Sequence, residues 1–387
     1  MALIHISAQT VPADTGYVSR KLKLAEINLV SSYYNQDGNN AAVTGGIGSE
    51  KLNDISNTID LKLIRYDKKH RKHHYTIDIG IDHYTSASSD RIDLKANSSA
   101  SHGDTRVYPS ISWSRENEKS GTTLSAGISA STEYDYQSYG ASVSYAQKNR
   151  NRMGEFTAKL QVFLDQVKLI TPIELRPGGN GNEDDDHYPS TSRNTFAGSL
   201  SYSQIINESL QVMFLADVVQ QQGYLGLPFH RVYFTDGSVQ QEKLPDSRFK
   251  LPLGVRGSYF IGDHFILRGY YRYYTDDWGL HSHTASLEVP VKISPFLSLS
   301  PFYRFYSQIA VSSFALYKMH NKTDQFYTSN FDLSSFNSQF FGAGIHLTPT
   351  KGVLSIKRLN TLELRYGHYS KTTGMNAHII SLNLTYK

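Results

Sequence analysis

Apolar and polar residues alternate with a period of two over much of this chain. Residues 55–63 carry Ile, Asn, Ile, Leu and Leu at the odd positions, and Ser, Thr, Asp and Lys at the even ones. The same alternation recurs at 75–82, 107–114, 124–130, 156–164, 251–255, 287–291 and 380–386. Successive side chains of an extended strand point to opposite faces. The pattern therefore predicts strands that each have one apolar and one polar face.

The alternating segments, with the turn residues between them, predict an all-β protein of about sixteen strands. The expected strands are 22–34, 54–66, 73–86, 105–115, 121–135, 138–148, 155–169, 194–206, 209–222, 249–261, 264–276, 281–293, 297–310, 336–348, 358–370 and 376–386. Strands of about ten residues or more are long enough to cross a bilayer at a tilt.

The connections between these strands alternate in length. Short links follow every second strand, and most of the links between them are longer, as at 37–53, 88–104, 171–193, 223–248 and 311–335. Short periplasmic turns and long extracellular loops are typical of outer-membrane barrels, whereas soluble β-sandwiches do not sort their connections in this way. We therefore expect a transmembrane antiparallel up-and-down β-barrel over residues 21–387, in a bacterial outer membrane.

The composition supports a barrel wall. Hydrophobic residues make up 39% and charged residues 19% of the 387 positions, while Tyr (27) and Phe (18) are abundant. One face of each strand meeting lipid and the other meeting water explains this mixture, and Tyr is expected in the aromatic girdles. The mean hydropathy of -0.42 and the lack of an apolar run of about 18 residues exclude a helical membrane protein. No cysteine is present, which excludes a disulfide framework.

The net charge of +4 is mild and no basic stripe stands out, so we expect no nucleic-acid partner. The densest basic cluster, at residues 68–74, lies in an expected tight turn. Residues 1–20 are interpreted as an N-terminal segment, either the remnant of a secretion signal with a periplasmic lead-in or an ordinary terminus. No second domain is expected.

Two stretches carry a resemblance. They run from Ser32 to Leu52, beginning Ser-Tyr-Tyr-Asn-Gln-Asp-Gly, and from Tyr271 to Thr284, beginning Tyr-Arg-Tyr-Tyr-Thr-Asp-Asp-Trp. Both are similar to a family of bacterial outer-membrane proteins described as a domain of unknown function, over nearly the whole chain. The resemblance implies a barrel in the outer membrane and brings no catalytic residue. It also implies that such proteins are encoded near small lipoproteins and flavin-attachment enzymes. This arrangement would favour a role in a surface or electron-transfer assembly.

If the apolar face of each strand meets lipid, the polar face lines the interior. The charged residues expected to line the lumen are Asp60, Lys62, Asp78, Asp82, Arg256, Arg268, Arg272, Glu288, Lys292 and Arg304. The acidic group and the basic group would lie on opposite walls and set a transverse field across a water-filled pore. Alternatively, Arg268, Arg272 and Arg304 pair with Glu288 and loop carboxylates and thereby brace or plug the barrel.

Two groups of residues are candidates for metal binding. Asp276, Asp277, His281 and His283 fall in one tight loop and could ligate Zn²⁺ or another divalent ion, or act as an acid–base set at the barrel rim. Their spacing matches no zinc signature, so a loop capped by a hydrogen-bonded Asp is the alternative. Trp278 is expected at the membrane interface. The acidic run at 183–187 could bind Ca²⁺ but lacks the EF-hand spacing.

No nucleophile elbow of the form Gly-x-Ser-x-Gly occurs, so we expect a non-enzymatic barrel without a cofactor. The preferred function is a pore for small polar or anionic solutes. The alternative is a plugged barrel that anchors a surface or electron-transfer complex with a lipoprotein or other surface-protein partner. A minor alternative is a hydrolase or metal-binding protein with its site at the barrel rim. The apolar loop segments 224–229 and 314–331 would serve either as a docking surface or as a plug.

Overall fold

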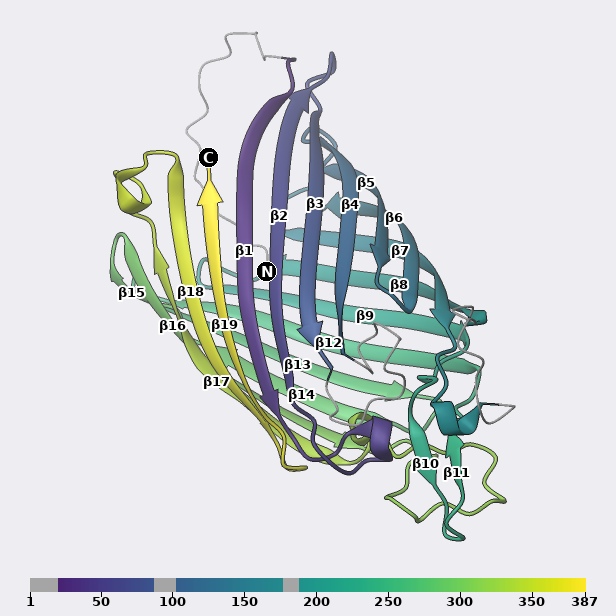
Figure 1. Cartoon of the computed structure of the whole chain (residues 1–387). Helices are drawn as coiled ribbons and strands as arrows, with labels where there is room; N and C mark the ends of the chain where they lie inside the picture. Colours follow the sequence, from purple (N-terminus) through teal and green to yellow (C-terminus); the bar gives the residue numbers. More distant parts are fainter. Residues whose placement is uncertain (1–19, 87–101, 177–187) are drawn as a thin grey trace.

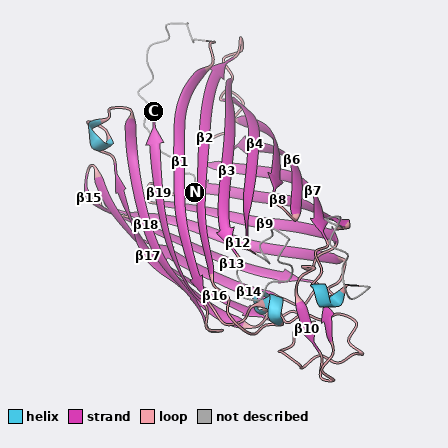
Figure 2. Ribbon diagram, in the orientation of Figure 1, coloured by secondary structure: helices cyan, strands magenta, loops and turns pink. Residues whose placement is uncertain are grey.

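The computed structural model describes residues 20–86, 102–176 and 188–387. Almost all regular structure in these residues is β-strand (Figures 1 and 2). The helical elements are the short 3-10 turns η1 (Ala42–Thr44), η2 (Ile173–Leu175), η3 (Phe331–Leu333) and η4 (Val353–Ser355). Within the described ranges, no helix is long and apolar enough to cross a membrane.

The strands follow one another around a single antiparallel sheet. The first nine are β1 (Lys23–Asp37), β2 (Leu52–Tyr66), β3 (Lys72–Thr85), β4 (Gly103–Asn117), β5 (Thr122–Thr132), β6 (Tyr136–Lys148), β7 (Gly154–Lys168), β8 (Ser190–Ile205) and β9 (Leu210–Gly223). The rest of the sheet is β12 (Ser247–Ile261), β13 (Phe265–Asp276), β14 (His281–Glu288), β15 (Val291–Ser294), β16 (Leu297–Ile309), β17 (Phe336–Leu347), β18 (Leu359–Lys371) and β19 (Asn376–Tyr386). A separate hairpin, β10 (Arg231–Tyr233) and β11 (Val239–Gln241), lies between β9 and β12.

The sheet closes on itself because β1 pairs with β19, from Ile27 opposite Tyr386 to Asp37 opposite Asn376. Closure leaves no edge strand with unpaired backbone groups, as a membrane-spanning sheet requires. β14 and β15 occupy one position between β13 and β16, interrupted at Pro290, which has no N–H to donate to the ladder. Counting them as one strand gives a closed barrel of 16 strands.

The predicted strands and fold class are confirmed. The largest shift of a strand end is at β8, which was expected to start at residue 194 and begins at Ser190. The β10–β11 hairpin was not predicted, because its strands are too short to show alternation.

The apolar face of the barrel points outward. Ile59, Ile128 and Leu160 lie in three different strands and are 46%, 65% and 65% exposed. Most of the fully buried apolar side chains of the described residues belong instead to the loops, for example Ile170 and Phe234. An apolar wall outside and a packed core in the loops is the arrangement expected when lipid surrounds the barrel.

The two ends of the barrel differ. Short turns join β2 to β3, β4 to β5, β6 to β7, β8 to β9, β12 to β13 and β15 to β16; we call this the turn end. Strand β1 starts there and β19 ends there. The connections at 38–51, 224–246 and 310–335 lie at the opposite, loop end, where Figure 1 shows the β10–β11 hairpin extending beyond the strand ends.

Candidate functional site

The inward face of β2, β3 and β4 carries an acidic wall. The register places Asp60 directly opposite Asp78, and Asp82 opposite both Ser56 and Arg106. Such close carboxylates repel one another unless hydrogen-bond donors or cations offset their charge.

Neighbouring side chains supply those donors. Asp82 is almost fully buried and accepts hydrogen bonds from Arg106 Nε at 3.0 Å and from the Tyr108 hydroxyl at 2.9 Å. Lys62 lies 3.9 Å from Asp60 and 2.8 Å from Glu26. The acidic wall is therefore braced by two cations, and both stay accessible to water: the Lys62 and Arg106 side chains are 44% and 45% exposed.

The inward face from β13 to β18 carries a paired cluster of charges. Arg268 Nη1 lies 3.1 Å from one oxygen of Glu288, and Arg365 Nη2 lies 3.1 Å from the other. Arg365 also pairs with Glu363 at 3.1 Å. Arg268 is therefore paired with Glu288, as the second interpretation of the sequence expected, and this ion pair braces the wall.

Three other arginines of this wall form no ion pair among the described residues. Arg256 and Arg304 are exposed, and their guanidinium groups lie 5.6 Å and 5.8 Å from the ring centres of Tyr270 and Phe340. Arg272 is half-buried. No carboxylate of the described residues matches their positive charges; we call these three residues the arginine row.

The strand register fixes how the arginines of this row are placed across the sheet. Arg256 lies opposite Tyr270, which lies opposite Ser286, and Ser286 lies opposite Arg304. Arg256 and Arg304 therefore lie on one line across the sheet, perpendicular to its strands. Arg272 is two residues further toward the loop end, a rise of about 7 Å along its strand. Lys292 lies nearer the turn end, opposite Ser298, and completes the set of predicted basic residues.

The predicted metal set is not assembled. Asp276 accepts hydrogen bonds from Arg248, from the Tyr274 hydroxyl and from the backbone N–H groups of Trp278 and Leu280. It is the capping carboxylate of a tight turn, as the alternative interpretation expected. Asp277 accepts a hydrogen bond from the backbone N–H of Phe249 at 3.0 Å.

The two histidines of that set point elsewhere. His281 and His283 contact the hydroxyls of Tyr273 and Tyr271 at 3.3 Å and 2.7 Å, on the outward face of the barrel. Among the described residues these four side chains do not come close enough together to share an ion. Trp278 also differs from expectation: it is buried among Leu280 and Val311 rather than at the membrane interface. The acidic run at 183–187 lies outside the described residues.

The long loops pack against one another at the loop end; we call residues 38–51, 169–176, 224–246 and 310–335 the loop cap. Val43, Ile170 and Phe229 come from three different loops and form one buried cluster. Val232, Phe234 and Tyr327 form a second cluster, which joins the β10–β11 hairpin to the loop 310–335. Sequence patterns did not predict this packing, because each loop contributes only a few apolar side chains.

Arg231 links three loops of the cap. It is 5% exposed, donates to Glu174 Oε1 at 2.5 Å and to the backbone carbonyl of Val43 at 3.0 Å, and lies in the β10–β11 hairpin. Burying a guanidinium is costly unless acceptors surround it. This residue therefore ties the cap together by polar contacts in addition to the apolar clusters.

Glu242 forms a second polar link within the cap. Its carboxylate is buried, accepts a hydrogen bond from the Thr328 hydroxyl at 2.5 Å and lies 3.4 Å from His230 Nδ1. Burial alone would raise the pKa of Glu242, but His230 and these hydrogen bonds hold that pKa below its ordinary value. The hairpin and the loop 310–335 are joined by a charged group that stays ionised.

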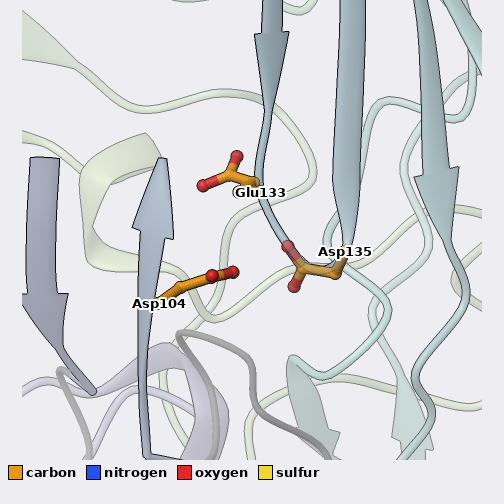
Figure 3. Close-up of side chains that lie close together, drawn as sticks. All are labelled: Asp104, Glu133 and Asp135. Carbon is orange, nitrogen blue, oxygen red and sulfur yellow. The ribbon is translucent and has the colours of Figure 1, made fainter. Parts of the chain in front are cut away.

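One cluster at the loop end was not predicted from the sequence. The side chains of Asp104, Glu133 and Asp135 lie close together (Figure 3). They offer carboxylate oxygens that all lie within 4.8 Å of one another. It is the only group of three or more His, Asp or Glu side chains in the described ranges that is close enough to share a cation. Glu133 and Asp135 flank Tyr134 and could be recognised in the sequence as neighbouring acids. Asp104 joins them only because β4 pairs with β5.

Burial raises the pKa of Asp135 to about 6, and the neighbouring carboxylates of Glu133 and Asp104 add to the rise. Burial also raises the pKa of Glu133, although a hydrogen bond from the Tyr84 hydroxyl acts in the opposite direction. A proton or a cation would relieve the repulsion among the three groups.

These features define a closed antiparallel barrel of the outer-membrane class, with charged inward walls and a packed loop cap. The chain belongs to the family described as protein of unknown function (DUF3570), whose sequence profile matches residues 84–379. The family resemblance seen in the sequence is thereby confirmed. No curated protein matches the sequence.

Solved structures with a similar fold are outer-membrane barrels. A mutant of the ferric enterobactin receptor PfeA from Pseudomonas aeruginosa is 13% identical with a TM-score of 0.46; the match covers 90% of this chain and 53% of that one. This chain thus spans about half the length of that receptor. A BenF-like porin from Pseudomonas fluorescens Pf-5 is 10% identical with a TM-score of 0.42, over 94% and 98% of the two chains. OpdK from Pseudomonas aeruginosa, solved with vanillate, is 7% identical with a TM-score of 0.42, over 93% and 97%.

Proposed function

We propose that this protein is a non-enzymatic outer-membrane pore that passes small polar solutes and favours anions. The arginine row carries the proposal. Arg256, Arg272 and Arg304 face the lumen without a carboxylate partner among the described residues, and two of them are exposed to water. A cation that is neither paired nor buried raises the local concentration of anions.

Barrel size supports an open lumen. Barrels of 16–18 strands leave an aqueous channel, whereas those of about eight strands fill their interior with side chains. The barrel has 16 strands, and inward side chains such as Arg268 remain 33% exposed even when they are ion-paired. The acidic wall at β2–β4 and the basic wall at β12–β16 lie on opposite sides of the ring and would orient polar solutes between them.

The proposed orientation follows from the connections. In outer-membrane barrels the short turns face the periplasm and the long loops face outward. The turn end would then be periplasmic, and the loop cap would set the width of the outer entrance. The lipid bilayer is the only partner that this function requires.

A second candidate is a membrane anchor for a surface or lipoprotein partner. Leu316 and Met319 lie on the loop 310–335 and are 53% and 63% exposed. Exposed apolar side chains on an otherwise packed cap favour a docking surface. In that case the barrel would be silent in a bilayer although it is folded.

The anion preference is tested by the double variant Arg272→Gln and Arg304→Gln. A unit charge contributes about 1 kcal/mol at about 4 Å in water, so the anion-to-cation permeability ratio should fall on the order of fivefold. The ratio is obtained from the reversal potential in a salt gradient across a planar bilayer. Arg268 is left intact, because its removal would free a Glu288 oxygen and add a second effect.

The matched control is Arg65→Gln with Arg115→Gln. Both residues lie at outward-facing register positions near the turn end, so this variant removes the same charge from outside the lumen. Its selectivity should equal that of the wild type. Equal selectivity in the wild type and in the lumen variant would refute the role of the arginine row.

A further inference from the structure

A polar pocket opens on the outside of the barrel where β1 and β19 meet at the loop end. Its volume is about 800 Å³. The side chains that matter for its chemistry are Asn35, Asp37, Asn39, Lys51, Asn376 and His378. None of these residues has a role in the lumen or in the cap clusters described above.

The pocket is held in shape by two connections. The Asn40 side chain, in the loop 38–51, donates a hydrogen bond to the Thr373 carbonyl of the β18–β19 turn at 2.6 Å. Within the same loop, the backbone N–H of Glu50 donates to the Gly38 carbonyl at 2.8 Å. The loop is thereby fixed against the turn, and the hollow between them is part of the fold.

The depth of the pocket follows from the outward positions of its strands. Along β1 these are Ile27, Leu29, Ser31, Tyr33 and Asn35, and along β19 they are Leu384, Leu382, Ile380, His378 and Asn376. The outward face therefore changes from apolar to polar at Tyr33, and Tyr marks the interface of a barrel with its bilayer. Asn35 lies about 7 Å further along the strand. The pocket is thus at the level of lipid headgroups.

The lining favours a neutral ligand rich in hydroxyls. Each Asn amide presents both donors and an acceptor, which matches a hydroxyl group that also donates and accepts. Asn39 and Asn376 make no side-chain hydrogen bond to other described residues, so their amides are available. Lys51 and Asp37 lie 3.8 Å apart and offset each other, which disfavours a phosphate or another strongly charged group.

An aromatic face completes the lining. The His378 ring is stacked on Tyr366, with centroids 6.1 Å apart and an interplanar angle of 21°, and its Nδ1 lies 2.8 Å from the Tyr366 hydroxyl. A ring fixed in this way offers an apolar face to the C–H groups of a sugar ring, beside amides that can bind its hydroxyls.

We infer that this pocket binds the sugar headgroup of a glycolipid in the surrounding leaflet. The ligand class follows from the amides and the ring, and the lipid source follows from the depth of the pocket on the outer face of the barrel. The inference rests on the proposed membrane location and is independent of whether the lumen conducts.

The test is native mass spectrometry of the full chain in phosphatidylcholine nanodiscs to which a neutral glycolipid, monoglucosyl diacylglycerol, is added in trace amounts. The wild type should retain this glycolipid, and the double variant Asn39→Ala and Asn376→Ala should bind it about tenfold more weakly, the loss expected for two hydrogen bonds. The variant His378→Ala should also weaken binding. A shift in electrophoretic mobility on heating confirms that each variant is folded before it is heated.

The matched control is His83→Ala. His83 is another outward histidine at the loop end, bonded to Thr105 and outside the pocket. It should bind the neutral glycolipid like the wild type. Equal binding by all variants, or equally strong binding of phosphatidic acid, would overturn the inference.

The soluble headgroup alone, methyl glucoside, is tested separately. Weak binding of this free sugar supports the lipid-borne source, whereas binding as tight as that of the intact glycolipid would overturn that source. Conductance of the same purified variants in a planar bilayer distinguishes a failure of this inference from a failure of the pore.

Discussion

Strand pairing can bring charged side chains together that lie far apart in the sequence. The carboxylates of Asp104, Glu133 and Asp135 are the example in this protein. The two turn acids flank Tyr134, whose backbone N–H donates to Asp104 at 3.0 Å. This contact brings three carboxylates together in a partly buried place at the loop end. Their mutual repulsion is a local cost to the folded state, which a change of pH can reveal.

The variant Asp135→Asn should be more stable than the wild type at pH 7. The pKa of Asp135 is raised in the folded state to about 6 from an ordinary value of 3.8, so the folded state binds the proton more tightly than the unfolded state. Wild-type stability therefore falls as pH rises from about 4 to about 6. The variant lacks this loss, which is on the order of 3 kcal/mol at pH 7.

Thermal unfolding midpoints in detergent at pH 4 and pH 7 test this prediction. The advantage of Asp135→Asn should be present at pH 7 and should shrink toward pH 4. The control Glu118→Gln removes one carboxylate from an exposed turn and should change neither midpoint. A variant less stable than the wild type at pH 7 would show that the Asp135 carboxylate is stabilising.

At the scale of elements, the strands could be predicted from the sequence because alternation is a local signal. Ile55 to Leu63 alternate within one strand, and no distant contact is needed to see it. The loop cap could not be predicted, since Val43, Ile170 and Phe229 are brought together only by tertiary packing. The interruption at Pro290 was also missed, although a proline inside a ladder is a visible signal.

The same distinction explains the candidate sites. Alternation predicted which charged residues share a face, but not that Arg268 is paired with Glu288 while Arg304 is not. For the predicted metal set, nearness in sequence was misleading. The Asp276 carboxylate caps the backbone of the tight turn that follows it, while His283 lies on the outward face of the next strand.

The cap itself should depend on Arg231. The variant Arg231→Met keeps a long side chain but leaves the buried carbonyl of Val43 without its donor, which costs on the order of 2 kcal/mol. The loops should then open more often, and limited proteolysis within the loop cap should accelerate on the order of tenfold. The barrel should keep its heat-dependent electrophoretic mobility, because no wall contact is lost.

The control for the cap is Lys322→Met, which breaks the ion pair of Lys322 with Asp236. Both side chains are exposed, 59% and 43%, and such surface pairs contribute about 0–1 kcal/mol. Cleavage of this variant should resemble that of the wild type. Equal cleavage rates for Arg231→Met and the wild type would mean that the apolar clusters alone hold the cap.

At the scale of the whole molecule, the barrel separates three environments. Its outward face is apolar, its lumen carries an acidic wall opposite an arginine row, and its buried core lies in the loop cap. A structural anchor does not need unpaired arginines in its lumen, whereas a pore that favours anions does. The central claim is therefore that solutes pass through the lumen.

Single-channel conductance of the purified protein in a planar lipid bilayer tests this claim most directly. We predict a steady open conductance, with a reversal potential in a salt gradient that indicates anion preference. A silent bilayer, from protein shown to be folded by its heat-dependent mobility, would contradict the pore and favour a membrane anchor with a closed lumen.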